Sequence, residues 1–422
     1  MPTADELLGP DVLARLIGVL EGVLPGHPFA ALRASAEKLP PLALRQRSEL
    51  LKDALLSDLP GSAAELAATV RVAMTDARFT GWLIWPVTEA VSARALEPPV
   101  RPDDFDDALA LLAELTPRLT AEFAIRGLLQ ADLARALPTI LSWVQSPDPH
   151  VRRLASEGTR AFLPWAKRVA ALLENPESTL PIINALYRDE SDYVRRSVAN
   201  HLNDLSRQSP DLAASVAAEW MLAPDANTAH VVRHGLRSLV KKGHGATMAL
   251  FGFSPNHGVA VTGPVLRATE PPDPVVLDPA HLDSALLGRA LLGRGLLDSV
   301  PLNPVPLDPV PLNPLPLVEV TIGDELAFSV SLTNPTAQPA TLVVDYVVHH
   351  RKANGTQTTK VFKLTTTTLG PGQSVTYERR HSFKRITTRT YHPGEHAIEV
   401  QVNGVASGRT AFLLRADQLP GP

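Results

Sequence analysis

The stretch His150–Arg160, HVRRLASEGTR, and the stretch Asp192–Asn200, DYVRRSVAN, share a Val-Arg dipeptide that begins at Val151 and at Val194. A third dipeptide begins at Val232, and the three are spaced by 43 and then 38 residues. These spacings are within or just below the length of HEAT and armadillo units. Such helical units bury their apolar sides only by stacking on neighbours. The sequence therefore predicts a curved α-solenoid with one concave face.

Local signals place each dipeptide at the opening of a helix. Asp148 is positioned to cap the first helix and Pro149 to occupy its first helical position, and Ser191 is in the capping place before the second. The segment Ser156–Trp165 and the residues that follow it to 173 are expected to be helical. Upstream of the repeats, apolar residues recur at spacings of three and four, which predicts consecutive amphipathic helices.

Composition changes divide the rest of the chain. Residues 254–316 are rich in proline, which predicts polyproline II or irregular structure. From residue 317 the apolar pattern alternates, with turn signals such as Asn403-Gly404 between short segments. We therefore expect a HEAT-like α-solenoid over 1–253, a Leu/Pro-rich linker over 254–316 and an immunoglobulin-like β-sandwich over 317–417.

Charge is unevenly distributed along the chain. The formal net charge is -4, from 40 Lys and Arg against 44 Asp and Glu. The acidic excess lies in the first quarter and the linker, whereas residues 346–392 carry nine Lys or Arg and one acid, Glu378. A local basic patch can attract phosphates whatever the net charge of the chain.

Several functional classes lack support in the sequence. Cysteine is absent, so disulfides and thiolate metal sites are excluded. There is no Walker loop, Gly-rich dinucleotide turn, His-Glu-x-x-His motif or nucleophile elbow. No signal peptide and no membrane span are recognisable, which predicts a cytoplasmic protein.

Two carboxylates are candidates for a shared site. The 43-residue offset aligns Glu157 with Asn200, and Asp204 lies one helical turn after Asn200 on the same face. Stacked repeats would then direct both acids into one groove. The alternative is that these acids only neutralise the neighbouring arginines in ion pairs between repeats.

Tryptophan residues also have two interpretations. Trp165 follows Pro164 at an expected helix boundary, where an indole usually packs in the core. Its functional alternative is a flat surface offered to a nucleobase or a sugar. For Trp82 and Trp85, in a region otherwise poor in aromatic residues, packing is the favoured explanation.

Cations gather at three places that suit phosphate contact: beside the two carboxylates, at the end of the solenoid and in the basic stretch after Glu378. The candidate phosphate-binding residues are Arg152, Arg153, Arg160, Arg195, Arg196, Arg233, Arg237, Lys241, Lys242, Arg379, Arg380, Lys384, Arg385 and Arg389.

At several ordered stretches the chain resembles the HEAT-like repeat alkylpurine DNA glycosylases, and specifically the AlkC-type branch. These stretches are Glu122–Arg126, His150–Arg160, Leu163–Trp165, Asp192–Asn200, Leu202–Asp204, His234–Arg237, Leu239–Gly243 and Tyr391–His396. They cover the solenoid and extend into the sandwich, which some members of the family carry.

The resemblance implies excision of positively charged N-alkylated bases, of the N3-methyladenine and N3-methylcytosine class, from duplex DNA. Hydrolysis of the N-glycosidic bond would occur without deep base flipping. By motif position, Asp204 is the expected catalytic carboxylate, Glu157 its partner for water or sugar, Trp165 the wall against the lesion, and Glu122 a fourth candidate.

The resemblance further implies a monofunctional enzyme of base excision repair that needs no metal and no organic cofactor. Its partner would be double-stranded DNA carrying alkylated bases, and we expect a monomer that associates with the nucleoid when on DNA. The alternative is a catalytically inactive HEAT-like solenoid that binds DNA or a protein partner.

Overall fold

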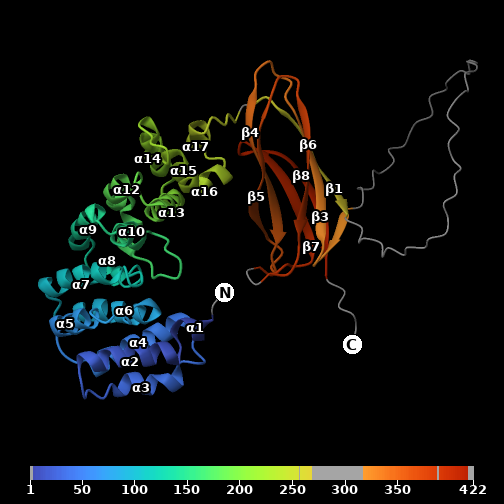
Figure 1. Ribbon diagram of the computed structural model, residues 1–422. Coiled ribbons are helices and arrows are strands. Elements are labelled where there is room, and N and C mark those ends of the chain that lie inside the picture. The colour runs from blue at the N-terminus through green and yellow to red at the C-terminus, as the bar shows by residue number, and fades with distance from the viewer. Residues whose placement is uncertain (1–2, 256, 269–316, 387–388, 417–422) are drawn as a thin grey trace, which may run out of the picture. The chain divides into compact units, whose positions relative to one another are not determined.

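The computed structural model describes residues 3–255, 257–268, 317–386 and 389–416. Two compact units divide the chain, Met1–Phe251 and Gly252–Pro422. The first is built from helices and the second from strands (Figure 1). This confirms the predicted fold class, an all-α unit followed by a β-sandwich.

The first unit consists of α-helices joined by turns and short 3-10 segments. In chain order its helices are α1 (Ala4–Leu8), α2 (Pro10–Val23), α3 (Ala30–Ser35), α4 (Leu44–Asp58), α5 (Ala63–Ala73), α6 (Ile84–Ala95), α7 (Pro102–Leu115), α8 (Ile125–Ala131), α9 (Leu133–Ser142), α10 (Pro149–Gly158), α11 (Ala170–Glu174), α12 (Leu180–Leu186), α13 (Asp192–Gln208), α14 (Pro210–Leu222), α15 (Thr228–Gly235), α16 (Arg237–Lys241) and α17 (Gly245–Leu250). The 3-10 segments are η1 (Ala36–Lys38), η2 (Gly81–Leu83), η3 (Trp143–Gln145) and η4 (Pro176–Thr179).

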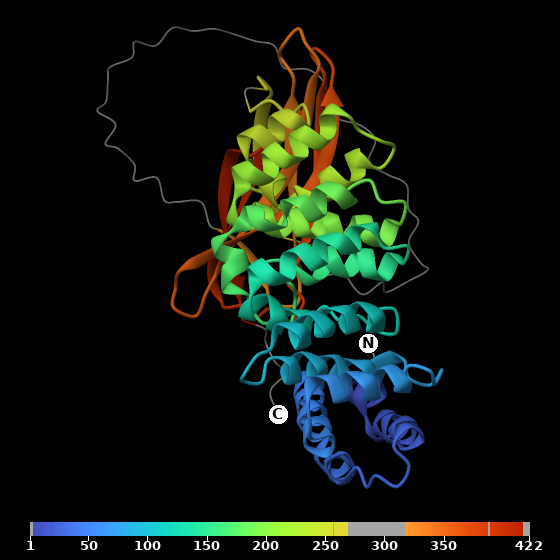
Figure 2. The ribbon, with the colours of Figure 1, turned by 90° about the vertical axis from the view of Figure 1, so that its left-hand side faces the viewer.

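These helices follow one another in stacked layers, as Figure 2 shows for the helical unit. Helix α6 packs against α4 and α7, and α13 packs against α10 and α15. The three Val-Arg dipeptides lie on α10, α13 and α15, so successive repeats are spatial neighbours as predicted. The third dipeptide, however, does not open its helix, because Val232 lies in the middle of α15.

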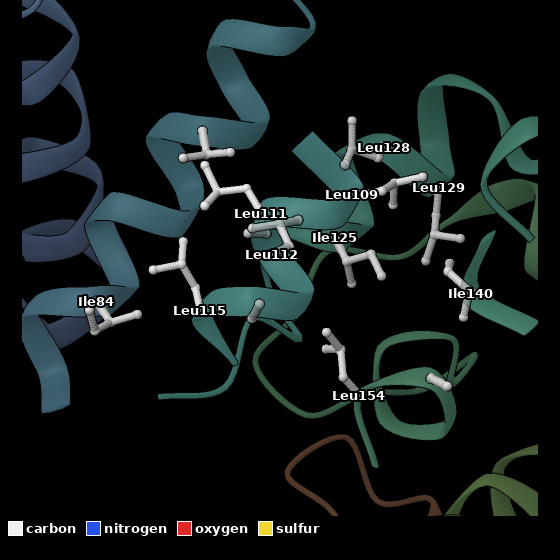
Figure 3. Packing of buried hydrophobic residues seen from close by; sticks show 14 of the residues in the cluster. Ile84, Leu109, Leu111, Leu112, Leu115, Ile125, Leu128, Leu129, Ile140 and Leu154 are labelled. Atoms are coloured by element: carbon white, nitrogen blue, oxygen red, sulfur yellow. The ribbon is translucent and has the colours of Figure 1, made fainter. Parts of the chain in front are cut away.

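A continuous apolar core supports the end of α10. Side chains from α7, α8, α9 and α10 converge there, and Leu112, Ile125, Ile140 and Leu154 are fully buried (Figure 3). Helix α10 approaches α8 so closely that a Cβ at Gly158 would lie 2.8 Å from Ile125 Cγ2. Only glycine permits this contact, which fixes the last turn of α10 against the core.

Local signals at the two repeat openings behave differently. The Asp148 side chain accepts a hydrogen bond from the His150 backbone N–H at 2.7 Å, and Pro149 is the first helical residue, as predicted. Ser191 occupies the N-cap of α13, but its side chain makes no capping hydrogen bond. The carboxylate of Asp189 instead accepts from the Ser191 N–H at 2.8 Å and orders the turn.

The prediction of a helix over Ser156–Trp165 is wrong for the residues after Gly158. Helix α10 ends at Gly158, and the segment 159–169 is irregular before α11 begins. Arg126 Nη1 donates hydrogen bonds to the carbonyl oxygens of Gly158 and Arg160, at 3.1 and 2.9 Å. A continued helix would use these oxygens as acceptors for its own backbone N–H groups. A proline follows at position 164 and has no N–H to donate.

The second unit is a β-sandwich. Its strands are β1 (Ala260–Ala268), β2 (Val318–Thr321), β3 (Glu325–Thr333), β4 (Ala340–Arg351), β5 (Gln357–Leu369), β6 (Ser374–Ser382), β7 (Gly394–Val402) and β8 (Val405–Arg415). One sheet has the order β1-β3-β6 and the other β2-β8-β7-β4-β5. All pairings are antiparallel except that of β2 with β8.

The predicted alternation appears in the burial of β3, where Leu326, Phe328, Val330 and Leu332 point into the core. The hairpin between β7 and β8 turns at Asn403-Gly404, where φ is 48° and 78°, the values that this dipeptide favours in a two-residue turn.

Strand β1 lies inside the range expected to be linker, so the linker does not begin at residue 254. Residues 260–268 pair with β3, and the register shifts between Thr262 and Val265, where Pro264 lies. Proline is tolerated there because β1 is an edge strand and the pairing is interrupted. The remaining proline-rich residues, 269–316, lie outside the described part of the chain. Within the described part, none of the helices has the length and apolar character needed to cross a bilayer.

Candidate functional site

Buried ion pairs join the end of α10 to α13. Glu157 lies in the last turn of α10 and Asp204 on α13, and Arg160 in the loop after α10 connects them. The guanidinium donates through Nη1 to Glu157 Oε1 at 2.5 Å and through Nε to Asp204 Oδ2 at 2.9 Å. The sequence offset between repeats therefore brings both carboxylates to one cation.

Each carboxylate has a further partner. The Ser197 hydroxyl donates to Glu157 Oε2 at 2.6 Å, and the Phe162 backbone N–H lies 3.3 Å from Asp204 Oδ2. Glu157 is 6% exposed and Asp204 only 1%. Removing ions from water costs several kcal/mol each unless partners compensate. The interpretation of these acids as ion-pair partners between repeats therefore describes Asp204 well.

Glu122 belongs to the same network. Its Oε2 pairs with Arg153 Nη1 and accepts from the Thr120 hydroxyl at 2.9 Å. Arg153 also lies 3.6 Å from Glu157, and its guanidinium covers the ring of Tyr193 at 5.2 Å. The network thus extends from α13 to the residues just before α8.

Carboxylates and guanidinium groups alternate in this network. Glu122, Glu157 and Asp204 form ion pairs with Arg153 and Arg160, and the charge of Asp204 also acts on Arg126 and Arg237. Burial alone would lower the pKa of the Arg160 guanidinium, but the charge of Glu157 and the hydrogen bond that Arg160 donates to Asp204 outweigh it, and its pKa is raised. Arg160 therefore stays charged and keeps Glu157 and Asp204 paired.

A cleft of about 260 Å³ opens beside this network. Its lining combines aromatic rings with charged side chains. The lining includes Trp82, Trp85, Phe123, Trp165, Glu122, Glu157 and Arg160. Glu157 contributes to the lining, whereas Asp204 does not. Of the two expected carboxylates, only Glu157 can contact a ligand in the cleft.

Trp165 faces the solvent, which rules out the core-packing interpretation. It is 78% exposed and adopts a φ of 62°, a conformation that residues with a Cβ rarely adopt. Its carbonyl oxygen accepts a hydrogen bond from Arg45 of α4. The loop 159–169 thus holds an indole at the mouth of the cleft.

Comparison with known proteins identifies both units. Residues 119–237, which include Glu122, Glu157, Arg160, Trp165 and Asp204, match the family model described as DNA alkylation repair enzyme. The helical unit carries a DNA alkylation repair domain. Residues 315–416 match the model described as the C-terminal Ig-like domain of the uncharacterised protein YhaZ. These matches confirm the resemblance and the Ig-like fold.

Two relatives extend over most of the chain. The uncharacterized protein YhaZ of Bacillus subtilis (strain 168) is 29% identical over 368 residues, 87% of this chain and 86% of the relative. The solved structure of the Pseudomonas fluorescens alkylpurine DNA glycosylase AlkC, bound to DNA containing an abasic site analog, matches with a TM-score of 0.78 and 28% identity. That match covers 98% of this chain and 100% of the other.

In the alkylation repair domain, some expected DNA-binding cations have structural partners instead. Arg152 is 7% exposed, pairs with Asp189 at 2.7 Å and donates to the Ser146 carbonyl oxygen at 2.9 Å. Arg195 donates to the Asp189 carbonyl oxygen at 2.6 Å. Arg152 is almost completely buried and holds the turn between repeats, so the structure does not support it as part of the expected interface.

The other expected cations of the helical unit differ in exposure. Arg153 and Arg160 belong to the ion-pair network, and Arg237 donates to the His234 carbonyl oxygen at 2.5 Å and to Asn200 Oδ1 at 3.1 Å. Exposed positions remain open to a phosphate, although Arg196 also lies 3.1 Å from Asp192. They are Arg196, Arg233, Lys241 and Lys242.

In the Ig-like unit the expected cations lie on β6 and in the segment after it. Arg379, Arg380, Lys384 and Arg385 are exposed. Arg380 lies 4.0 Å from Glu325 on the neighbouring strand. Arg389 is half-buried, and its Nη1 contacts His350 Nε2 at 2.5 Å, so it is partly committed to the interior of the sandwich.

Sequence reasoning missed the aromatic wall. The Trp82–Trp85 pair was assigned to packing, which holds for Trp85 at 3% exposure, yet both indoles line the cleft. Phe123 continues the wall, with its ring 5.0 Å from that of Trp85. The sequence signal for this wall is the pair Trp82 and Trp85, two of the five tryptophans of the chain, only three positions apart. Among the described residues, no three His, Asp or Glu side chains are grouped as ligands for a metal ion.

Proposed function

We propose that the protein is a DNA glycosylase that removes positively charged N-alkylated bases, of the N3-methyladenine and N3-methylcytosine class, from duplex DNA. The observation that carries this proposal is the cleft whose lining combines the carboxylates of Glu122 and Glu157 with indole rings. The family match at the same residues and the likeness to a DNA-bound alkylpurine glycosylase support it.

The chemistry suits these side chains. An alkylated base carries a positive charge and is therefore a good leaving group, so no general acid is required. The transition state resembles an oxocarbenium ion, which a nearby carboxylate stabilises. Water then completes the hydrolysis and leaves an abasic site, which is the outcome of a monofunctional glycosylase.

Each residue takes a separate role in this proposal. Glu157 faces the sugar or its attacking water, and Glu122 adds negative charge to the same side of the cleft. The exposed Trp165 supports the lesion at the surface, consistent with excision without deep base flipping. Asp204 becomes a positioning residue, because it is buried and acts by holding Arg160 against Glu157.

Base release from methylated duplex DNA under single-turnover conditions tests the proposal. Glu157→Gln keeps hydrogen-bonding capacity but loses the charge, so release is expected to slow at least about 100-fold, with binding to abasic-analog DNA retained. Asp204→Asn is expected to have a smaller effect, and the matched control is Glu174→Gln at an exposed position. Full activity of Glu157→Gln would remove Glu157 from the mechanism.

One observation favours a second function, that of a catalytically inactive DNA-binding solenoid. Both oxygens of Glu157 are already engaged, by Arg160 and Ser197, as in a purely structural ion pair. The same assay separates the two functions. Selective binding of alkylated DNA by the unmodified protein without base release would establish the inactive binder.

A further inference from the structure

A second cavity, of about 340 Å³, adjoins the cleft. The two share Phe123 but differ in their charged lining. Helices α4, α6 and α8 and the loop 159–169 provide the charged groups of the second cavity, five cations and one carboxylate. They are Arg45, Lys52, Arg126, Lys167, Arg168 and Glu89.

Arg126 lines this cavity and has a buried hydrogen-bond donor without a partner among the described residues. The residue is 3% exposed, and its Nε donates to the Lys167 carbonyl oxygen at 2.6 Å. Nη1 holds the carbonyl oxygens of Gly158 and Arg160. Nη2 is buried and has no partner within the described part of the chain. A buried charged donor without a partner is unfavourable, and a bound acceptor would satisfy it.

Arg126 also lacks an opposing charge. Burial lowers the pKa of its guanidinium to about 10, and repulsion from Arg168 and Arg160 contributes to the shift. Asp204 counteracts this only weakly. An anion beside Nη2 would therefore relieve both the missing hydrogen bond and the repulsion among the cations.

The other charged groups leave the cavity positive. Lys52 lies 2.9 Å from Asp53 and Arg45 lies 3.6 Å from Glu49, while Arg168 donates to the Ala161 carbonyl oxygen at 3.2 Å. Within the cavity, Glu89 is the single carboxylate, and burial raises its pKa despite its hydrogen bond from Trp85 and the nearby cations. Glu89 therefore gives up its charge more readily than an ordinary glutamate.

We propose that this cavity binds a phosphate group, with Arg126 Nη2 as its buried donor and Lys52, Lys167 and Arg168 as its outer cations. A phosphate offers several acceptor oxygens to donors that converge from different elements, which suits this arrangement better than a single-plane carboxylate. Two kinds of ligand carry such a phosphate group: the DNA backbone, as a phosphodiester, and a free phosphate monoester.

The DNA source rests on the proposed function and adds to it. Arg126 donates to the carbonyl oxygens of Gly158 and Arg160, in the turn that directly follows Glu157. A backbone phosphate on Nη2 would fix the same guanidinium from its other end. Phosphate binding would thereby order the loop 159–169 next to the cleft.

Methylphosphonate scanning of abasic-analog DNA tests the DNA source. One neutral linkage near the analog is expected to weaken binding to the unmodified protein roughly tenfold, and to have no further effect on Lys52→Gln/Lys167→Gln. Both lysines are outside the catalytic network. The control Lys38→Gln changes an exposed cation outside the cavity and should keep the full loss.

Thermal unfolding of the intact protein with inorganic phosphate, at ionic strength matched by chloride, tests the monoester source. Stabilisation that disappears in the double lysine variant would assign the cavity to free phosphate. If neither experiment distinguishes this variant from the unmodified protein, the phosphate site is refuted. The base-release assay tests the glycosylase proposal separately. If the protein releases base but the double lysine variant loses as much affinity on methylphosphonate substitution as the unmodified protein, the DNA-phosphate site is contradicted and the glycosylase is not. If the variant abolishes the methylphosphonate effect but the protein releases no base, only the glycosylase proposal is contradicted.

Discussion

The two units bury polar groups in different ways. In the helical unit the buried Arg160 is surrounded by charged partners, and His201 is hydrogen-bonded at both ring nitrogens, to Thr179 and to the Ser156 carbonyl oxygen. In the sandwich, His350, His381 and His396 lie within one aromatic cluster, and each has a buried ring nitrogen without a described partner.

This difference follows from what each unit does. The helical unit maintains charges next to a cleft, and the ion pairs around Arg160 offset the cost of burying them. In the aromatic cluster of the sandwich, burial keeps the histidines neutral by lowering their pKa values, to about 3 for His350 and about 4 for His381. Its cations are instead placed on the exposed β6 strand and after it.

The strongest test of the comparison removes the central cation of the helical unit. Arg160→Met leaves Glu157 and Asp204 buried without their shared partner, so unfolding free energy is expected to fall by about 3–5 kcal/mol. Urea unfolding followed by tryptophan fluorescence reports on this unit alone, since all five tryptophans lie there. Arg196→Met, at a side chain 65% exposed, is the control and should cost less than about 1 kcal/mol.

The sandwich should respond to acid through its histidines. An unfolded histidine has a pKa near 6.5, so between pH 6.5 and about 4 the unfolded state binds a proton that folded His381 does not. Stability is therefore lost as the pH falls through this range, by roughly 3 kcal/mol for His381. His381→Phe should remove that part of the pH dependence, measured by hydrogen exchange in β4 and β7. An unchanged pH dependence would contradict a neutral, buried His381.

Exposed cations allow the two units to be compared as DNA contacts. We expect Arg379→Gln/Arg380→Gln in the sandwich and Lys241→Gln/Lys242→Gln in the helical unit each to flatten the dependence of log affinity on log salt. The expected change is roughly 0.9 for each phosphate contact removed. Arg409→Gln on β8 serves as the control within the sandwich. If only one pair changes the slope, only that unit contacts the backbone there.

The smallest effect concerns the two repeat openings in the helical unit. Asp148→Ala removes a capping acceptor and should cost about 1 kcal/mol of unfolding free energy. Ser191→Ala removes no capping hydrogen bond and should stay within about 0.5 kcal/mol. Equal losses in urea unfolding would mean that the two repeats begin in the same way.

The sequence predicted what periodic patterns determine. Dipeptide spacing predicted that α10, α13 and α15 are neighbours, and alternation predicted the buried side chains of β3. The offset between repeats also brought Glu157 and Asp204 to the same place, because side chains on stacked helices repeat with the helices.

Non-periodic contacts were not predictable in this way. The end of α10 at Gly158 depends on Arg126, which reaches it from another helix, and no local signal encodes that hydrogen bond. The same holds for the exposure of Trp165, since the segment beyond α10 is irregular. Strand β1 was missed because Pro264 made an edge strand with an interrupted register resemble a linker.

The hydrogen bond from Arg45 to the carbonyl oxygen of Trp165 spans 120 residues of sequence. A helix near the start of the chain therefore helps to hold the loop that borders the cleft. Replacement of Arg45 is therefore expected to alter the loop and the cleft rather than the apolar core, because its partner is a carbonyl oxygen of the loop. Residues far from the repeats in sequence can thus determine the geometry of the cleft.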